Sequence, residues 1–352
     1  MSVEIQTPAV MIDLDIVRKN IIRFQSFADQ HGFKVRPHIK THKLPKMAEL
    51  QLEAGAIGIT CQKVSEARSM VEGSDQIRDV LITYNIIGDE KLSQLLDLAD
   101  RVSLSVVADS TAVVDGLSKA FAGRPKPLRV LVECNTGADR CGVATPDAAA
   151  VLAKYIAASD GLAFGGLMTY PPVGGQLHVQ RFMTAAKALI VADGLAVGTI
   201  TTGGTPDMMT ANRNPVATEY RPGTYVYNDR SLVARGVCSW KDCALTVLAT
   251  VVSVPAANRA IIDAGSKALT SDLLGLTGYG HVLGRDDINI DQLSEEHGRL
   301  VSDGPIGLDV GQKVRIVPNH ACVVTNMTDF VHVVSASRGL EVWPVVARGK
   351  VL

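Results

Sequence analysis

The chain has 352 residues and a mass of 37.4 kDa, with 47% hydrophobic and 20% charged residues. This composition supports a sizeable core and excludes a disordered chain. The 35 lysines and arginines nearly balance the 36 acidic residues, which excludes a strongly basic nucleic-acid-binding protein and gives no electrostatic attraction to an anionic membrane surface. The length fits two domains, or one α/β barrel with an additional domain.

The six cysteines include no C-x-x-C pair and show no disulfide framework, as is usual in a reducing compartment. The first residues lack the basic stretch and apolar run of a signal peptide. No segment approaches the roughly 18 apolar residues that a membrane span requires. We therefore expect a cytoplasmic protein without a membrane or nucleic-acid partner.

Short apolar runs alternate with helix-like segments through the first two thirds of the chain. The expected strands are residues 35–38, 57–60, 80–83, 102–107, 128–133, 164–168, 199–203 and 219–221. The clearest expected helices are residues 16–28, 89–99, 146–158 and 179–193. Continuous apolar runs are typical of parallel strands that helices cover. Eight such units favour a (β/α)₈ TIM-type barrel over an open doubly wound sheet, which stays the alternative.

The pattern changes near residue 230, where β-branched runs follow one another with little helix between them. These runs are residues 245–254, 259–263, 313–317, 321–324 and 330–334. Glycine and proline separate them, which is typical of a small antiparallel β domain. We expect a barrel over residues 1–230 and a β-rich domain over residues 231–352, with the first residues able to pair with the second domain.

A basic cluster follows the first expected strand. It contains Arg36, His38, Lys40, His42 and Lys43. The loops after barrel strands carry the active sites of such folds. A lysine that is partly desolvated beside other cations is favoured as a neutral amine, the form that makes a Schiff base with an aldehyde cofactor. A solvated basic loop accounts for the cluster equally well.

The loops after the seventh and eighth strands have the composition of a phosphate site. The first contains Thr202, Gly203, Gly204 and Thr205, and the second contains Gly223 and Tyr225. Glycine lets backbone N–H groups approach a phosphate, and hydroxyl groups add donors. Barrels often bind phosphate at this position. A glycine pair alone is common in loops, so the prediction depends on the two loops together.

Arg140 and Tyr170 follow the fifth and sixth strands, at the same expected mouth of the barrel. There an arginine can lie near an anionic oxygen and a tyrosine can cover a bound ring. A surface arginine and a packed aromatic residue are the alternative. The convergence of several strand ends on one mouth favours the functional interpretation.

His320 and Cys322 are two residues apart in an expected strand, so their side chains should project from one face. An imidazole and a thiolate placed in this way suit Zn²⁺. From the spacing alone, two ordinary core residues are the favoured interpretation.

Four segments, taken in order, resemble the D-threonine aldolase and D-serine dehydratase family. They are residues 36–43, 218–225, 293–298 and 318–322. Members are pyridoxal-phosphate enzymes with the alanine-racemase-like barrel and β domain (fold type III). The resemblance implies that Lys40 carries pyridoxal 5'-phosphate. It also implies that His320 and Cys322 bind a divalent metal, Zn²⁺ or Mn²⁺, which reverses the interpretation from spacing.

The resemblance further implies that the phosphate lies against the loops with Gly203, Gly204, Thr205 and Tyr225, and that Arg140 and Tyr170 face the cofactor ring. Two positions depart from the usual pattern or vary within it. Asn135 stands where relatives usually have aspartate, and Cys322 is the softer of the two ligands found at its position.

The implied activity is that of a lyase that cleaves D-threonine-like β-hydroxy amino acids to glycine and an aldehyde. The alternative is a D-serine, D-threonine or 3-hydroxyaspartate dehydratase that yields a 2-oxo acid and ammonia, with Lys40 as the base at Cα. His38 and His42 are the candidate general bases for aldol cleavage. A racemase or a non-enzymatic cofactor carrier would have no use for a metal, and the resemblance also implies a homodimer.

Overall fold

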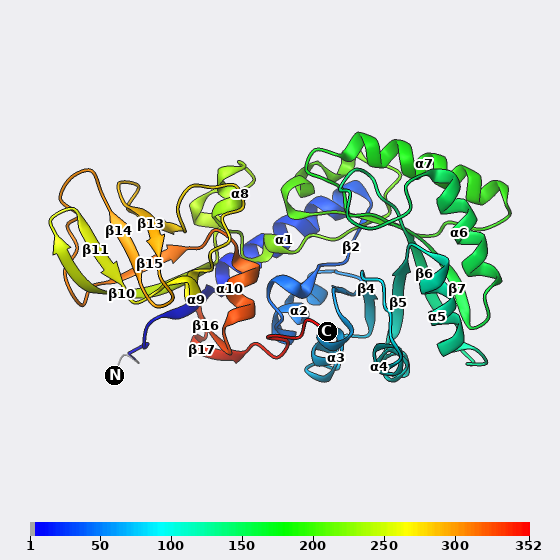
Figure 1. Cartoon of the computed structure of the whole chain (residues 1–352), viewed down its shortest axis with the longest axis horizontal. Coiled ribbons are helices and arrows are strands. Elements are labelled where there is room, and N and C mark those ends of the chain that lie inside the picture. Colours follow the sequence, from blue (N-terminus) through cyan, green and yellow to red (C-terminus); the bar gives the residue numbers. More distant parts are fainter. Residues whose placement is uncertain (1–3) are drawn as a thin grey trace. The chain divides into compact units, whose positions relative to one another are not determined.

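The computed structural model describes residues 4–352, which form two compact units, each built on its own sheet (Figure 1). The barrel unit comprises residues 22–40, 45–223 and 350–352. The β unit comprises residues 4–21, 41–44 and 224–349. Each unit therefore joins segments that are distant in the sequence.

Eight parallel strands form the sheet of the barrel unit within the described residues. They are β2 (Lys34–Val35), β3 (Ile59–Cys61), β4 (Asp79–Ile82), β5 (Ser103–Ala108), β6 (Leu128–Glu133), β7 (Leu162–Met168), β8 (Ile200–Thr202) and β9 (Glu219–Tyr220). Their order is β2-β9-β8-β7-β6-β5-β4-β3, and a parallel bridge between His38 and Thr60 links its two ends. The predicted (β/α)₈ barrel is confirmed.

Side chains from successive strands fill the barrel, as expected for a closed sheet of this size. Leu81, Val107, Leu131 and Met168 form one cluster, and each is at most 2% exposed. They come from β4, β5, β6 and β7, so one layer of side chains joins four neighbouring strands.

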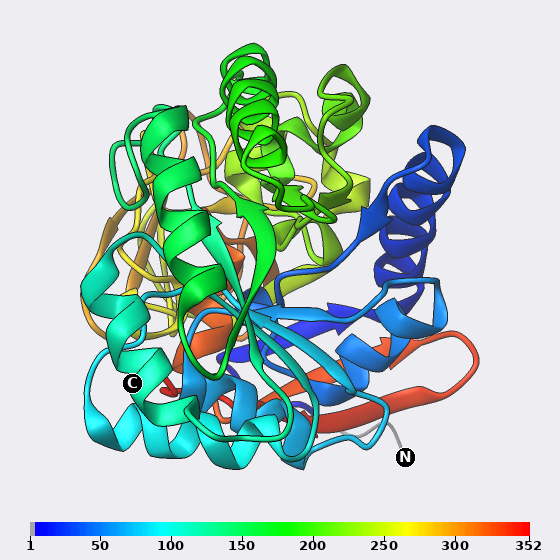
Figure 2. The same cartoon turned by 90° about the vertical axis from the view of Figure 1, so that its right-hand side faces the viewer.

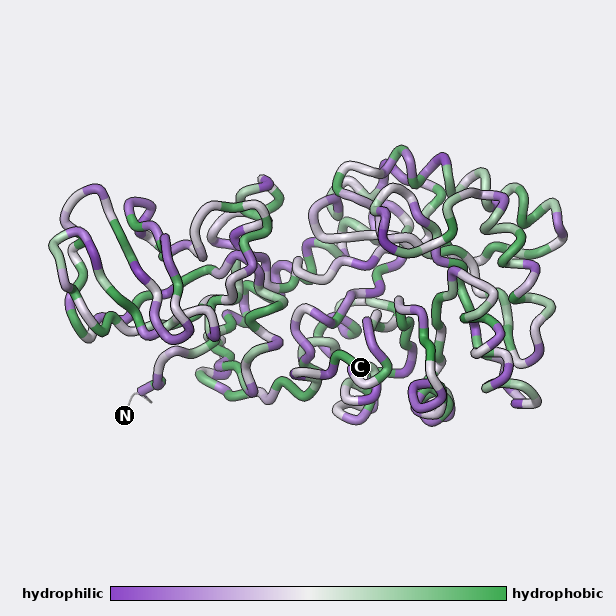
Figure 3. Tube along the Cα trace, in the orientation of Figure 1, coloured by the Kyte–Doolittle hydropathy of each residue, from purple (hydrophilic) through white to green (hydrophobic). Residues whose placement is uncertain are grey.

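Helices cover the outside of the curved sheet (Figure 2). They are α1 (Leu14–His31), α2 (Pro45–Glu53), α3 (Val64–Glu72), α4 (Asp89–Ala99), α5 (Thr111–Phe121), α6 (Pro146–Ala158) and α7 (Gln176–Ala192). The start of α6 shows why some bounds were predictable, because Thr145 accepts a hydrogen bond from the Ala148 amide at 3.1 Å and Pro146 fits the first turn. Hydrophobic and hydrophilic residues alternate along these helices, as one buried face requires (Figure 3).

Nine strands form the sheet of the β unit in the described part of the chain. They are β1 (Ala9–Asp13), β10 (Leu245–Ala256), β11 (Arg259–Ile262), β12 (His281–Val282), β13 (Asn289–Leu293), β14 (Gly298–Val301), β15 (Lys313–Val317), β16 (Phe330–Ser335) and β17 (Gly339–Pro344). The pairs are antiparallel except β1 with β16. The predicted small antiparallel β domain is confirmed, and the parallel pair of β1 and β16 is an addition to it.

One expected strand of this unit is wrong, because residues 321–324 lie in helix α10 (Ala321–Met327). Asp229 accepts a hydrogen bond from the Ala321 amide at 3.1 Å, which satisfies a donor at the start of the helix. The Thr325 hydroxyl donates to the Ala321 carbonyl at 3.1 Å. The β-branched composition of this segment favours a strand, but these hydrogen bonds stabilise a helix instead.

Short helices complete the structure. They are α8 (Arg230–Ala234), α9 (Ser266–Leu269) and the 3₁₀ segments η1 (Ile39–Thr41), η2 (Thr205–Arg213), η3 (Thr224–Val226) and η4 (Trp240–Asp242). Among residues 4–352, no helix combines the length and the apolar character needed to cross a membrane.

Candidate active site

The segment that carries Lys40 continues from β2 at the carboxyl end of the barrel strands. The Arg36 amide donates to the Tyr220 carbonyl at 3.0 Å, and the His38 amide donates to the Pro222 carbonyl at 2.9 Å. This pairing brings the chain into η1, where Lys40 is half-buried. Lys40 therefore lies at the end of the barrel where the loops of such folds hold their active sites.

The two histidines that flank Lys40 lie in different environments. His38 is 8% exposed, and its Nε2 lies 3.1 Å from Gln62 Oε1, while its Nδ1 accepts the Lys40 amide at 3.4 Å. His42 is fully buried, and its Nδ1 accepts the Leu44 amide at 3.1 Å. Each imidazole is therefore hydrogen-bonded to neighbouring protein groups.

The glycine loop after β8 has the features of an anion cradle. Gly203 has φ +138°, and a Cβ at this residue would lie 2.7 Å from the Arg221 amide nitrogen. Only glycine fits this close approach. Within the described residues, the buried Thr202 hydroxyl has no hydrogen-bond partner. Buried polar groups nearly always have a hydrogen-bond partner, so the Thr202 hydroxyl beside the glycine backbone is suited to bind a phosphate oxygen.

The second loop predicted for phosphate contacts the first. The Gly223 amide donates to Thr205 Oγ1 at 3.2 Å, so the two loops meet. The Gly204 carbonyl accepts a hydrogen bond from the Tyr220 hydroxyl at 2.7 Å, which fixes the loop from the barrel wall. Tyr225 belongs to the β unit and is 1% exposed.

Arg140 and Tyr170 form a cation–π pair on the carboxyl side of the barrel. The guanidinium carbon lies 4.9 Å from the ring centroid, and the tyrosine is 45% exposed. A Cβ on Gly204 would lie 3.6 Å from the Tyr170 ring, so the ring stands beside the glycine loop. The structure thus brings these three predicted residues together.

A buried carboxyl group that our sequence prediction missed lies on β6. Glu133 is 4% exposed, and burial raises its pKa to about 7, although Arg140 and Arg221 oppose this shift. The nearby charge of Asp109 raises the pKa of Glu133 further. A carboxylate oxygen of Asp109, a carboxylate oxygen of Glu133 and the sulfur of Cys141 all lie within 4.8 Å of one another. The available signal was a carboxylate at the end of an apolar strand.

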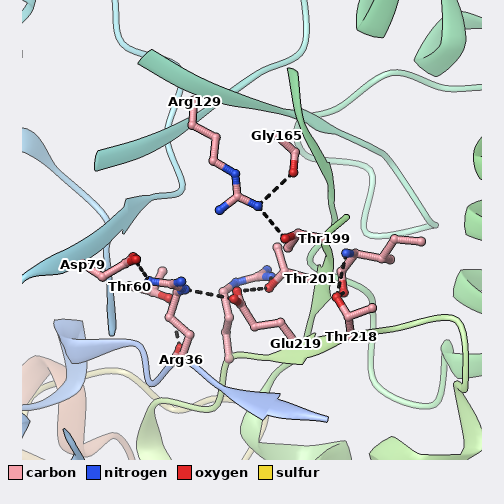
Figure 4. Close-up of polar contacts among 11 residues, drawn as sticks. Arg36, Thr60, Asp79, Arg129, Gly165, Thr199, Thr201, Thr218 and Glu219 are labelled. Carbon is pink, nitrogen blue, oxygen red and sulfur yellow. Dashed lines mark hydrogen bonds and ion pairs between the residues drawn. The ribbon is translucent and has the colours of Figure 1, made fainter. Parts of the chain in front are cut away.

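A buried polar network occupies the barrel interior (Figure 4). Arg36 Nε donates to Glu219 Oε2 at 3.0 Å, and its other branch pairs with Asp79. Thr201 donates to Glu219 Oε1 at 2.6 Å and accepts from Arg221 at 2.6 Å. The network joins the residue after β2 to β4, β8 and β9, so it fixes the strands that precede the two phosphate-type loops.

The predicted metal ligands lie at the start of α10 in the β unit and not on a strand. His320 is the N-cap residue, and Cys322 lies in the first turn. Their side chains are hydrogen-bonded to each other. Burial lowers the pKa of His320, but the Cys322 thiol and the Asp272 carboxylate outweigh burial and raise it to about 9. Burial raises the pKa of Cys322, and its contact with His320 reverses the shift and lowers it.

Donors surround this imidazole–thiol pair. Thr41 Oγ1 lies 3.2 Å and Thr224 Oγ1 3.6 Å from Cys322 Sγ. These threonines directly follow Lys40 and Gly223 in the sequence. A histidine and a thiol of lowered pKa, with two hydroxyl groups beside the sulfur, form a donor set suited to Zn²⁺.

Two family models match the chain. Residues 12–231 match the alanine racemase N-terminal domain, and residues 244–334 match the putative serine dehydratase domain. A 3-hydroxy-D-aspartate aldolase of Paracoccus denitrificans (strain Pd 1222) is 33% identical, over 99% of this chain and 93% of its own length.

Solved structures are similar over nearly the whole chain. D-threonine aldolase from Filomicrobium marinum has a TM-score of 0.90 and 34% identity, over 99% of this chain and 97% of its own. D-threo-3-hydroxyaspartate dehydratase from Delftia sp. HT23 has a TM-score of 0.86 and 30% identity, over 97% of both chains. A metal-free form of a cysteine-to-alanine variant of the D-threo-3-hydroxyaspartate dehydratase is also similar, with a TM-score of 0.87.

Proposed function

Because this chain belongs to the D-threonine aldolase and D-serine dehydratase family, we propose that it cleaves D-threonine-like β-hydroxy amino acids to glycine and an aldehyde. The chain is an enzyme of the lyase class, like the aldolases and dehydratases that it matches. The observation that favours a metal-dependent lyase over a racemase is the hydrogen-bonded pair of His320 and Cys322. A racemase with this fold would need two opposed bases and no such donor pair.

We propose that the loops after the barrel strands hold pyridoxal 5'-phosphate. Lys40 would hold the cofactor, and Arg140 and Tyr170 would face its ring. The phosphate would be held by the residues of the two loops, Thr202, Gly203, Gly204, Thr205, Gly223 and Tyr225. The unpaired Thr202 hydroxyl and the close approach at Gly203 support this assignment. When bound, the cofactor stabilises negative charge at the substrate Cα.

We propose that His320 and Cys322 hold a divalent metal. Thiolate and imidazole favour Zn²⁺, with Mn²⁺ as the alternative. When bound, the metal would supply Lewis-acid chemistry for a substrate β-hydroxyl group. Thr41 and Thr224 would hydrogen-bond the ligand sulfur and keep it as a thiolate, which metal binding requires.

The hydrogen bonds of the two histidines favour a second candidate, the dehydratase. Aldol cleavage needs a base that takes the β-hydroxyl proton, but His42 is fully buried and His38 is bonded to Gln62 and to the Lys40 amide. Dehydration needs a base at Cα, and the Lys40 amine would serve there. The Cys322 ligand, which we associate with dehydratases, points in the same direction.

A product assay decides between the candidates. The purified protein would be incubated with D-threonine, with Zn²⁺, with Mn²⁺ and after chelation. Glycine plus acetaldehyde is expected, whereas 2-oxobutanoate plus ammonia would establish the dehydratase. If cofactor-loaded protein forms neither product under any metal condition, both candidates are rejected.

The role of Lys40 has its own test. Borohydride reduction of the loaded protein, followed by peptide mass spectrometry, should find the cofactor on the peptide that contains Lys40. Lys40→Arg should lose this adduct, and Lys46→Arg, at an exposed position, should keep it. The homodimer belongs to the same proposal, and sedimentation at several protein concentrations tests it.

A further inference from the structure

Asp272 binds the ring of His320 at Nδ1. Its Oδ2 lies 2.7 Å from His320 Nδ1, and both side chains are partly buried, at 38% and 26% exposure. A carboxylate on Nδ1 keeps the proton on that nitrogen and leaves the lone pair of Nε2 available. Histidine ligands of metals commonly have such a carboxylate partner.

The chain holds Asp272 in place through a short local structure. The Asp272 amide donates to Thr270 Oγ1 at 3.1 Å. Thr270 ends the one-turn helix α9 and has φ +64°, a conformation that side chains of this type rarely adopt. Such a conformation persists only where the surrounding structure fixes it.

The anchor of α9 is the segment of residues 293–298, which matches the family but has no place in the proposed chemistry. The Ser266 amide donates to the Ser294 carbonyl at 2.8 Å, and the Lys267 amide donates to the Glu295 carbonyl at 3.2 Å. A Cβ at Gly265 would lie 2.3 Å from the Ser294 carbonyl oxygen, so only glycine allows this contact. The segment therefore fixes the helix that leads to Asp272.

We propose that Asp272 is a positioning residue that orients His320 and fixes its tautomer for metal binding, and that residues 293–298 serve this role by anchoring α9. The inference rests on the proposed assignment of His320 and Cys322 as metal ligands. Asp272 acts through His320 and takes no part in the reaction itself.

Metal affinity of the full-length, cofactor-loaded protein tests the proposal. Metal-stripped protein would be titrated with Zn²⁺ in competition with a chromogenic chelator. Asp272→Asn removes the charge with almost no change in volume, and it should weaken Zn²⁺ binding about 10- to 100-fold. Asp272→Glu, which retains a carboxylate, should recover part of this loss.

A second aspartate–histidine pair gives a matched control. Asp286 lies 3.5 Å from His281 Nε2 in the same unit and is exposed. Asp286→Asn should bind Zn²⁺ as the unchanged protein does. The denaturant midpoint of metal-free Asp272→Asn would be measured beside the affinity, because a purely structural role would lower the midpoint and leave the Zn²⁺ affinity of the folded protein unchanged.

The outcomes separate this inference from the proposed function. Zn²⁺ affinity within twofold of the unchanged protein in Asp272→Asn, together with strong loss in His320→Ala, would overturn only the positioning role. Unchanged affinity in both variants would overturn the metal assignment and this inference with it. The positioning role would be established if Zn²⁺ affinity falls from the unchanged protein to Asp272→Glu and falls again to Asp272→Asn.

Discussion

The hydroxyl oxygen of Thr41 lies 3.2 Å from the sulfur of Cys322, and Thr41 directly follows Lys40 in the chain. A single peptide bond therefore connects the proposed cofactor lysine to a neighbour of the proposed metal ligand. Hydrogen bonds to a thiolate stabilise its charged form. The contact gives the first prediction.

Thr41→Val should weaken Zn²⁺ binding about fivefold, the equivalent of losing one hydrogen bond worth ~1 kcal/mol. Valine has nearly the same shape as threonine and removes only the hydroxyl group. Thr41→Ser keeps the hydroxyl and should bind Zn²⁺ nearly as well as the unchanged protein. Chelator competition measures both variants, and equal affinity of Thr41→Val and the unchanged protein would contradict the prediction.

Gly203→Ala should lower the free energy of unfolding by about 1–3 kcal/mol, because φ +138° is unfavourable for alanine and the new methyl group would meet the Arg221 amide. Gly204→Ala is the matched control, since its Cβ would make an ordinary contact of 3.6 Å with Tyr170. Urea titrations of both variants measure the difference. Equal stability of the two variants would show that the loop relaxes without cost.

Glu133 should make stability depend on pH. Burial raises its pKa from 4.5 to about 7, so between these values the folded protein holds a proton that the unfolded chain has lost. The free energy of unfolding should therefore fall as the pH rises through this window. Glu133→Gln should remove this pH dependence. Above pH 7, the free energy of unfolding of the variant should be higher than that of the unchanged protein by on the order of 3 kcal/mol.

Urea titrations at pH 5, 6, 7 and 8 measure this effect of Glu133. Glu53→Gln, at an exposed position on α2, should keep the pH dependence of the unchanged protein. A Glu133→Gln variant whose stability follows the same pH curve as the unchanged protein would refute the assignment of this proton.

Glu219→Gln should destabilise the barrel unit by about 3–5 kcal/mol, because it leaves the Arg36 guanidinium buried without its full counter-charge. The two side chains are only 5% and 6% exposed, and 3.0 Å separates Arg36 Nε from Glu219 Oε2. Glu296→Gln, which breaks an exposed pair with Lys267, should change stability little. Thermal unfolding compares the two variants, and similar melting temperatures would contradict the expectation.

Local patterns made the barrel predictable. The central strands β4 to β7 are short, mostly apolar runs whose residues are mostly buried, so their composition marks them. The bounds of α4 and α6 were predictable for a related reason, because acidic residues at Asp89 and Glu90, and the Thr145–Pro146 cap, mark where these helices begin.

The positions of the candidate site residues in the loops followed from the same rhythm. The prediction that Lys40, Gly203 and Gly223 follow barrel strands needed only the order of strands along the chain. Their assignment to one cofactor rested on the resemblance, and it stays a proposal.

By itself, the sequence determined the barrel, the β domain and the family, because these depend on periodicity and on motifs that are continuous in the chain. Only the tertiary structure decided the environment of the proposed metal ligands. Asp229 lies 92 positions before Ala321 and starts the helix, and Asp272 lies 48 positions before His320 and holds its ring. Neither contact has a local signal, because hydrogen bonds between distant segments form only when the sheet has placed their loops together.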